Sequence, residues 1–292
     1  MWIQLFINIT LSFSIYLLIS YSFSMIYSTE GFFNISQAAI ITSGAYLTFF
    51  FKVQIGLSLA ISIIMAIVLS AIIGLLIELG IFKYLRKKKS HPFVLLLSSL
   101  GIYIILQNLI ALFWGDRNLS IRNNYSEIGN KVAGGFITDI QLITIITSII
   151  GISLFFTFMN NSKLGKKIRA ISSDKQLANN YGINVDKVIA ITVLISSAIM
   201  SLVGILVALD TDMVPTMGFG LLVFGIVAMI IGGIGSTWGL IIGSFVLASA
   251  QHFGAYFIDS NWMDAISYII LILILILKPL GFSGKQLKKV EI

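Results

Sequence analysis

The sequence predicts an all-α protein, a polytopic bundle of about eight or nine helices that span a membrane. Two observations lead to this fold class. Hydrophobic residues make up 58% of the 292-residue chain and charged residues only 11%, with a mean hydropathy of +1.00. The apolar residues also fall in runs that follow each other closely. A soluble domain carries about 25% charged residues, so residues 1–292 are expected to form a single transmembrane domain.

Nine apolar runs of about 20 residues predict the spans, and each is expected to be helical because lipid cannot satisfy free backbone groups. In chain order they are Leu5–Tyr27, Phe32–Phe51, Ile55–Leu79, Phe93–Trp114, Ile140–Met159, Val188–Leu209, Gly218–Gly235, Leu240–Ile258 and Met263–Leu277. The second run either crosses fully, which gives nine spans, or is broken or re-entrant, which gives eight. The first run has no basic flank and no small-residue cleavage site, so a retained helix is expected rather than a signal peptide.

Basic residues predict the orientation of these spans. Most of the 19 Lys and Arg residues lie in three stretches, at 83–89, 163–187 and 278–289. Loops rich in Lys and Arg stay in the cytoplasm, so these stretches, and with them the C-terminus, are expected to be cytoplasmic. The acidic residues at 210, 212 and 259 are then expected to face outward. These loops also account for the net charge of +7, so no nucleic acid partner is expected.

One long cytoplasmic loop, residues 160–186, is polar although it lies between two spans. Its sequence predicts a short helix through Asp174, with Ser172 or Ser173 as the N-cap and Gly182 at the C-terminal end. A short helix at the membrane face would suit the docking of a partner protein. An ordinary solvated connection is the alternative, since loops of this length are either functional or disordered.

The order of residues in this loop resembles the ATPase-contacting loop of ABC transporter permeases of the branched-chain amino acid (LivH/LivM) family. That family has a Gly-Arg-x-x-Arg-Ala start, an acidic residue, an alanine, and Gly-Ile-Asn before the next helix. The matching residues here are Gly165, Lys166, Arg169, Ala170, Asp174, Ala178, Gly182, Ile183, Asn184, Asp186 and Lys187. The resemblance covers nearly the whole chain. Further matching positions are Met25, Ile26, Tyr27, Gly31, Asn34, Ser99, Leu100, Gly101, Leu106, Gln107, Asn108, Pro215, Gly218, the run from Gly232 to Ser236, and Lys278, Pro279, Gly281, Phe282 and Gly284.

The resemblance implies a transport subunit rather than an enzyme. Members of the family work as paired permeases. The implied partners are therefore a second permease subunit, homologous or identical, two cytosolic ABC ATPase subunits and an extracytoplasmic substrate-binding protein. The chain has no G-x-x-x-x-G-K-[ST] run, so ATP is expected to be bound by the partner subunits, with no cofactor on this chain. The expected location is the plasma or inner membrane of a prokaryote.

Two sets of residues are the main functional candidates. By resemblance, the ATPase-coupling loop residues are Gly165, Arg169, Ala170, Asp174, Ala178, Gly182 and Ile183. Polar residues near or within spans are the translocation-pathway candidates, because they cost free energy unless they pair or face a cavity. These candidates are Asn34, Ser36, Gln37, Gln107 and Asn108. Ordinary interhelical hydrogen bonding is their alternative role.

Glycines and one carboxylate complete the candidates. Gly232, Gly233 and Gly235 either gate a pathway or let two helices pack closely, and close packing is the favoured interpretation. Glu78 lies at the cytoplasmic end of a predicted span. Its side chain is expected to reach toward Arg86 or toward lipid headgroups.

The sequence therefore predicts a permease subunit of an ABC importer for branched-chain or related amino acids. The family usually has an Asn-Phe-Ala-His-Gly run where this chain has Asn-Ile-Ser-Gln-Ala at residues 34–38, so urea or another small solute stays open as the substrate. An ion-coupled secondary transporter is the other alternative, although no carboxylate stands out at mid-span. No metal or catalytic site is expected, because the chain has no cysteine and His91 and His252 are isolated in the sequence.

Overall fold

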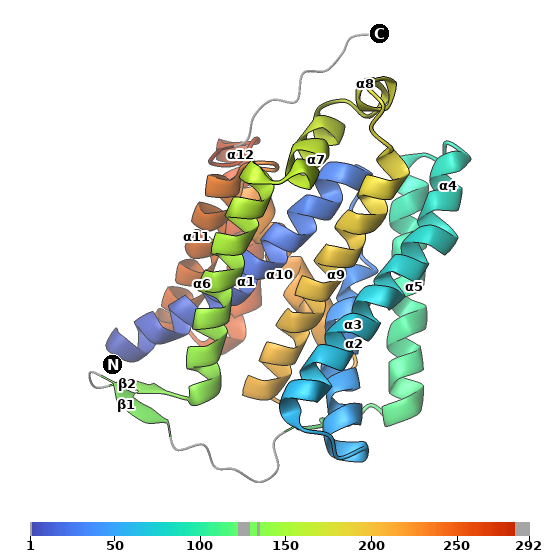
Figure 1. The fold of residues 1–292 in the computed structure, drawn as a ribbon. Coiled ribbons are helices and arrows are strands. Elements are labelled where there is room, and N and C mark those ends of the chain that lie inside the picture. Colours follow the sequence, from blue (N-terminus) through green and yellow to red (C-terminus); the bar gives the residue numbers. More distant parts are fainter. Residues whose placement is uncertain (1, 122–128, 133–134, 284–292) are drawn as a thin grey trace. The chain divides into compact units, whose positions relative to one another are not determined.

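The computed structural model describes residues 2–121, 129–132 and 135–283, and it confirms the all-α class (Figure 1). The helices are α1 (Trp2–Glu30), α2 (Gln37–Phe49), η1 (Phe50–Gln54), α3 (Leu59–Ile77), η2 (Glu78–Phe82), α4 (Lys83–Lys87), α5 (Pro92–Trp114), α6 (Asp139–Asn161), α7 (Lys163–Ser173), α8 (Lys175–Asn180), α9 (Val185–Asp210), α10 (Met217–Gly232), α11 (Thr237–Phe257), η3 (Ser260–Trp262) and α12 (Met263–Leu277). Two short strands, β1 (Asn130–Val132) and β2 (Gly135–Ile137), pair in antiparallel orientation.

Each of the nine predicted apolar runs coincides with a helix of the structure. Within the described residues, seven helices are long and apolar enough to cross a membrane. They are Trp2–Glu30, Leu59–Lys87, Pro92–Trp114, Asp139–Asn161, Val185–Asp210, Thr237–Phe257 and Ser260–Leu277. The other two runs form shorter helices: α10 has 16 residues, and α2 has 13 before it continues into the π-helix η1. The helical membrane bundle is therefore established, while the count of eight or nine spans stays a prediction.

The third predicted span begins and ends later than the apolar run that predicted it. Gly56, with φ +84°, and Ser58 precede the start of α3. At the other end the helix continues through η2 into α4 and reaches Lys87. Lys, Arg and Leu are good helix formers, so the basic residues extend the helix rather than end it. The basic stretch that begins at residue 83 thus stands on one continuous helix.

The chain divides into two compact units, each assembled from separate segments. Unit 1 comprises Met1–Ser24, Ile128–Leu177 and Phe224–Ile292. Unit 2 comprises Met25–Glu127 and Ala178–Val223. Helices α1, α8 and α10 each contribute residues to both units, so three of the connections between the units run through helices.

Helices α2, α3 and α9 form the centre of unit 2, where small residues let the backbones approach closely. Gly204 of α9 lies against the backbone of Ile41 in α2, and Gly44 of α2 lies against Ser201 of α9. Lipid tails are as apolar as the side chains they touch, so van der Waals packing of this kind is a main force between membrane helices. The glycines of this unit are therefore part of its core.

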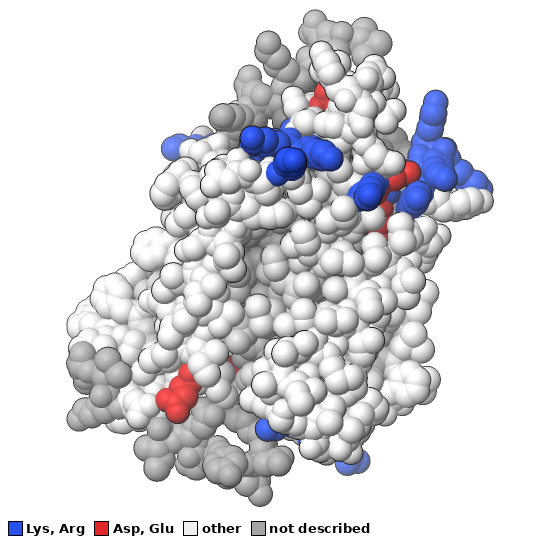
Figure 2. Space-filling view, in the orientation of Figure 1, with Lys and Arg blue, Asp and Glu red and all other residues white. Residues whose placement is uncertain are grey.

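One side of α3 is not covered by the rest of unit 2. The apolar side chains on that side are all at least 42% exposed: Ile61, Ile64, Val68, Ile72 and Leu76. Figure 2 shows an uncharged surface along α3, with basic side chains gathered at the α4 end. A continuous apolar helix face of this length is typical of contact with lipid.

Polar side chains in unit 1 pair with each other between α1, α11 and α12. The Tyr16 hydroxyl donates to Gln251 Oε1 at 2.7 Å, and Gln251 Nε2 donates to Ser267 Oγ at 2.6 Å. Ser12 Oγ and His252 Nε2 lie 2.7 Å apart and form another hydrogen bond between α1 and α11. These polar side chains satisfy each other's hydrogen-bonding groups within apolar helices. His252, which is isolated in the sequence, thus has a hydrogen-bond partner in the fold.

Candidate functional site

Residues 160–186 form two short helices, α7 and α8, instead of the single predicted helix. The predicted N-cap at Ser172 or Ser173 is wrong. Asp174 separates the two helices in an extended conformation, and its Oδ1 accepts a hydrogen bond from the Leu177 backbone N–H at 2.9 Å. A carboxylate caps a helix as well as a hydroxyl does, and the carboxylate lies one residue further along the chain.

The other end of α8 is built as the sequence predicts, with Gly182 after the helix. Gly182 has φ +81°, a conformation that glycine adopts without steric cost. The Ile183 backbone N–H donates to the Ala178 carbonyl at 3.1 Å, which is the hydrogen bond of a Schellman-type helix end. Asn184 Oδ1 then accepts from the Lys187 backbone N–H at 3.0 Å and caps α9. The turn from α8 into α9 is therefore fully specified by local hydrogen bonds.

The start of α7 packs tightly against the end of α6. Ser162 caps α7, because its Oγ accepts a hydrogen bond from the Gly165 N–H at 2.8 Å. A Cβ added to Gly165 would lie 2.7 Å from the Phe158 carbonyl oxygen and closer still to that of Met159. Arg169 Nη1 donates to the same Met159 carbonyl. The two predicted coupling residues at 165 and 169 thus hold α6 and α7 together at a sharp corner.

Helix α7 has one buried side and one basic, exposed side. Ile168 and Ile171 are buried, with at most 1% exposure, and Ala170 is half-buried beside them. Lys166 and Lys167 are exposed. The helix therefore packs against the rest of unit 1 through its apolar side chains and presents positive charge to the solvent.

Two large apolar side chains are exposed to the solvent at α8, one on the helix and one on the residue that directly follows it. Leu177 is 52% exposed and Tyr181 is 81% exposed, whereas Ala178 between them is buried. The first and last of these lie four residues apart, which brings them to one side of the helix. This pair is not among the residues predicted from the sequence. The signal for it was two large apolar residues four positions apart in an otherwise polar loop.

The pathway candidates Asn34, Ser36 and Gln37 lie together between α1 and α2, each 1% exposed. Asn34 Nδ2 donates to Glu30 Oε2 at 3.1 Å, and its Oδ1 accepts from Ser36 Oγ at 2.6 Å. Gln37 Oε1 accepts from Ser197 Oγ of α9 at 3.3 Å. The structure therefore brings these three candidates into one buried polar group.

Two helices of unit 2 begin in the middle of its apolar layer. Ser197, which bonds to the first residue of α2, lies 12 residues into α9, about 18 Å from the start of that helix. Helix α10 begins near the same level, because the Gly218 N–H donates to Thr42 Oγ1 at 3.2 Å. Each helix follows a non-helical stretch, 31–36 and 211–216. Non-helical backbone at membrane depth is tolerated only where it is buried in protein or lines a cavity, and paired interrupted helices mark the ligand path of many transporters.

The other two pathway candidates lie further along α5. Gln107 is half-buried, and Asn108 is exposed with its Nδ2 donating to the Ile104 carbonyl of its own helix at 2.7 Å. Ser99, two turns earlier, connects α5 to the non-helical stretch 31–36, because its Oγ accepts a hydrogen bond from the Ile35 N–H at 3.0 Å. A pathway role for the residues at 107 and 108 stays a prediction.

The glycines Gly232, Gly233 and Gly235 form the tight turn between α10 and α11 in unit 1. Gly233 and Gly235 have φ +100° and +83°, in the region that favours glycine. Gly232 lies directly against the backbone of Gly239, so a side chain at either position would separate the two helices. The Phe282 N–H donates to the carboxyl end of α10 at 2.9 Å and covers the turn. These contacts support close packing, and a gating role stays a prediction.

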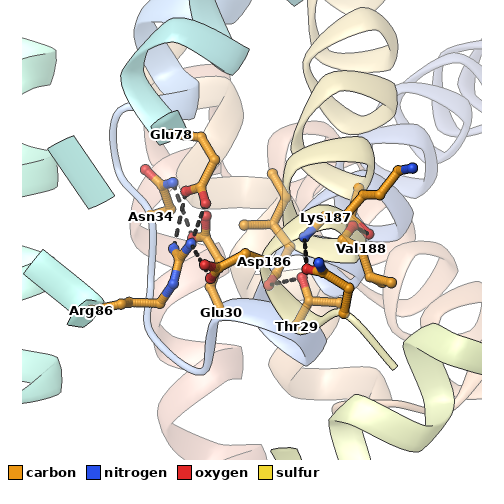
Figure 3. Close-up of polar contacts among 11 residues, drawn as sticks. Thr29, Glu30, Asn34, Glu78, Arg86, Asp186, Lys187 and Val188 are labelled. Atoms are coloured by element: carbon orange, nitrogen blue, oxygen red, sulfur yellow. Dashed lines mark hydrogen bonds and ion pairs between the residues drawn. The ribbon is translucent and has the colours of Figure 1, made fainter. Parts of the chain in front are cut away.

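Unit 2 also contains a charged cluster that the sequence analysis identified only in part (Figure 3). Arg86 donates to both carboxylate oxygens of Glu78, at 3.1 Å to Oε2, and its Nη2 lies 3.8 Å from Asp186 Oδ1. Glu30, 3% exposed, points toward the same guanidinium and is bonded to Asn34. The prediction that Glu78 reaches toward Arg86 is confirmed, but that carboxylate is only 1% exposed and pairs within the protein. The signal that could have predicted the whole cluster is Glu30, a second carboxylate near the end of a predicted span. A charge at that depth needs a partner.

Long apolar helices, an outward-facing apolar helix face and two interrupted helices are the features of a helical integral membrane protein, and interrupted helices of this kind are typical of transporters. A family model described as the permease component of the branched-chain amino acid transport system matches residues 5–275. The chain belongs to this family of transport permeases, as its sequence motifs predict.

Relatives of known name cover nearly the whole chain. It is 28% identical to the high-affinity branched-chain amino acid transport system permease protein LivH of Escherichia coli (strain K12), over 97% of this chain and 95% of the relative. It is 26% identical to BraD of Pseudomonas aeruginosa, over 93% and 92%, and 24% identical to a probable LivH of Methanocaldococcus jannaschii, over 94% and 90%. Among solved structures, PsaBC from Streptococcus pneumoniae in complex with Fab matches with a TM-score of 0.51 at 13% identity, over 92% and 90%, which shows similarity of fold.

Proposed function

We propose that this chain is one permease subunit of an ABC importer. Its partners are a second permease subunit, two cytosolic ABC ATPases that bind the ATP, and an extracytoplasmic substrate-binding protein. The observation that carries this proposal is the exposed apolar pair formed by Leu177 on α8 and Tyr181 directly after it, in the same loop as the tightly packed corner between α6 and α7. Exposed apolar side chains rimmed by polar residues are typical of a protein interaction site.

The proposed substrate is a branched-chain or related amino acid. The names of the LivH and BraD relatives support this choice. The start of α2 and the non-helical stretch before it supply polar residues in the apolar layer, Asn34, Ser36 and Gln37, where the ends of an amino acid could exchange hydrogen bonds during passage. Helix α10 starts beside the same helix, at Thr42. Urea or another small solute is the second candidate, because the residues at 34–38 depart from the usual pattern of the family.

We also propose that α4, α7, α8 and the C-terminus face the cytoplasm, in accordance with the positive-inside rule. In unit 2, Glu30 at the end of α1 lies at the same end as Arg86 of α4. Helix α1 has 29 residues and is about 43 Å long, so its first residue reaches the opposite side of the membrane. The N-terminus is then outside, which corresponds to nine crossings, because the run from Phe32 still crosses to the other side through α2 and η1 although its first residues are non-helical.

Labelling of single cysteines tests this orientation, because the natural chain has none. A membrane-impermeant maleimide should label Tyr181→Cys only in inverted vesicles and Trp2→Cys only in intact cells. Labelling of Tyr181→Cys from the outside of intact cells would invert the topology and remove the ATPase-docking role with it.

Uptake by the reconstituted importer tests the function. The chain is combined in proteoliposomes with the proposed ATPases, second permease and binding protein from the same organism, and uptake of radiolabelled leucine is measured with and without ATP. We expect uptake to require both ATP and the ATPases. Tyr181→Ala should weaken ATPase binding, whereas Tyr84→Ala, at another exposed tyrosine, on α4, should leave it unchanged. Accumulation of leucine against a gradient by the purified chain alone would rule out the ABC mechanism.

The corner between α6 and α7 provides the coupling test. Gly165→Ala forces a Cβ against two carbonyl oxygens, and Arg169→Gln removes the donor to Met159. We expect both variants to insert normally and to hydrolyse ATP while leucine uptake falls. Lys167→Gln, which removes an exposed charge from the same helix, serves as the control. Unchanged uptake in both corner variants would remove this segment from the mechanism.

A further inference from the structure

We propose that Arg86 is a positioning residue for the coupling segment: it holds the start of α9 through Asp186, and this one contact opens and closes while the rest of the cluster stays fixed. The consequence for transport rests on the proposed function. The positioning itself concerns unit 2 alone and can be tested without any partner.

The fixed part of the cluster is the pair between Arg86 and Glu78. The guanidinium donates to both oxygens of one carboxylate, and the carboxylate is 1% exposed. Two parallel hydrogen bonds give such a pair geometric specificity as well as strength. Breaking a buried pair leaves an uncompensated buried charge, so this contact is expected to persist in every state of the protein.

The exchangeable part is the contact between Arg86 and Asp186. It joins a single pair of atoms, Nη2 and Oδ1, at 3.8 Å, and the side chain of Asp186 is 40% exposed. Water can therefore replace the guanidinium at that carboxylate. Half-exposed pairs of this kind shift an equilibrium only about two- to fivefold, which is the range in which a docked partner could readily reverse the preference.

The location of Asp186 links this contact to the docking segment. It is the second residue of α9 and follows the turn at Gly182 that ends α8. Asn184, between Gly182 and Asp186, caps α9. Because local hydrogen bonds fix the turn between the two helices, a displacement of α8 moves the start of α9 with it. Whether Arg86 is engaged then depends directly on where α8 lies.

On its other side the cluster reaches the interrupted helix α2. Figure 3 shows Glu30 and Asn34 next to the guanidinium of Arg86. Glu30 accepts a hydrogen bond from Asn34, which in turn accepts one from Ser36, the residue before α2. Three carboxylates thus surround one guanidinium. When Asp186 withdraws, the guanidinium stays paired with Glu78 but loses one of its three carboxylate neighbours, so movement at α8 changes the electrostatic environment of Glu30 and of the start of α2.

The first test uses the purified chain alone in lipid nanodiscs. Spin labels are attached at Lys87→Cys on α4 and Tyr181→Cys after α8, and the distance distribution between them is measured by pulsed electron paramagnetic resonance. Asp186→Asn should lower the population at the main distance about two- to fivefold. Asp186→Glu keeps the charge and should restore it. Asp186→Ser, whose shorter side chain also lacks the charge, should behave as Asp186→Asn does.

A matched control separates the contact from the helix dipole. Asp264 is the second residue of α12, as Asp186 is of α9, and it is exposed. Asp264→Asn therefore removes the same favourable charge from the first turn of a helix without affecting Arg86. The distances should stay as in the wild type. If Asp186→Asn leaves the distribution unchanged, or if Asp264→Asn changes it equally, the positioning role is wrong.

The second test uses the reconstituted importer and measures ATP hydrolysed per leucine taken up. Asp186→Asn should raise this ratio about two- to fivefold, Asp186→Glu should return it toward the wild type, and Asp264→Asn should leave it unchanged. A change of distance without any ATP-dependent uptake by the wild type would contradict the proposed function and leave the positioning role supported. ATP-dependent uptake with an unaltered ratio in Asp186→Asn would overturn the inference and support the proposed function.

Discussion

The contact of Gly204 with α2 gives the sharpest prediction for the core of unit 2. In Gly204→Ala the added Cβ would lie 2.7 Å from the carbonyl carbon of Ile41 and closer still to its oxygen. Both atoms belong to the backbone in the middle of α2, so no side-chain rotation can relieve the contact. The two helices must separate or slide instead.

The size of the effect follows from that geometry. Moving the carbonyl carbon from 2.7 Å to the 3.4 Å of an ordinary contact already separates α2 and α9 by about 0.7 Å, and the closer carbonyl oxygen requires a larger separation. The separation also loosens the neighbouring contact between Gly44 and Ser201. Overpacking of a well-packed core costs about 1–3 kcal/mol, and the better helix propensity of alanine offsets up to about 1 kcal/mol. Because the added Cβ meets backbone atoms that cannot move aside, the cost is expected at the upper end of that range, about 3 kcal/mol, and the net loss after the offset is about 2 kcal/mol of unfolding free energy.

Equilibrium unfolding in mixed micelles of SDS and a mild detergent measures this loss. Trp114 lies 5.5 Å from Tyr46 of α2, centroid to centroid, so tryptophan fluorescence reports on this part of unit 2. Gly101→Ala is the control, because a Cβ on this glycine of α5 meets no atom within 4 Å. The control should be neutral or slightly stabilised, since alanine is the better helix former.

The comparison of the two variants decides the outcome. Equal stability of Gly204→Ala and Gly101→Ala would mean that α2 and α9 can separate without loss. The close approach of small residues would then not be what holds the centre of unit 2 together.

Three further predictions concern single contacts. Gly182→Ala places a Cβ at φ +81° and should cost about 1–2 kcal/mol, seen as faster proteolysis after α8 than in wild type. Tyr16→Phe removes the hydrogen bond to Gln251 and should cost about 0.6 kcal/mol in the same unfolding assay, the usual value between membrane helices; a loss above 2 kcal/mol would mean that the polar chain acts as a unit. Arg86→Met leaves the buried carboxylate of Glu78 uncompensated and should cost about 3–5 kcal/mol. The double variant with Glu78→Met should recover most of it, and no recovery would contradict the pairing.

The sequence was sufficient to predict the parts of the fold that depend on hydropathy alone. Nine apolar runs became nine helices, because a membrane segment has to satisfy its backbone internally and few structures do so. Local motifs were also predictable where the signal was a backbone requirement. Gly182 ends α8 in the left-handed region, as its place after a short polar helix indicated.

Features that depend on tertiary partners could not be predicted in the same way. Hydropathy leaves open whether the run from Phe32 is continuous or broken, because its non-helical start depends on a positive φ at Gly31 and on the bonds of Asn34 to its neighbours. Ser99 of α5 accepts a hydrogen bond from Ile35 in the non-helical stretch before α2, and the two residues lie 64 positions apart in the sequence. A single sequence gives no measure of such pairings.

The charged cluster indicates why this chain keeps ionised groups where apolar ones would serve stability as well. A buried ion pair is seldom more stable than well-packed apolar residues of similar volume, so the presence of Arg86 and Glu78 is not explained by the folding of unit 2. Their location is informative instead. They lie between the turn that follows α8 and the polar group that precedes α2, and the outer contact, with Asp186, is weak enough to be exchanged. A strong buried pair with one weak outer partner can hold two arrangements of nearly equal free energy, which an apolar core packed at full density cannot do.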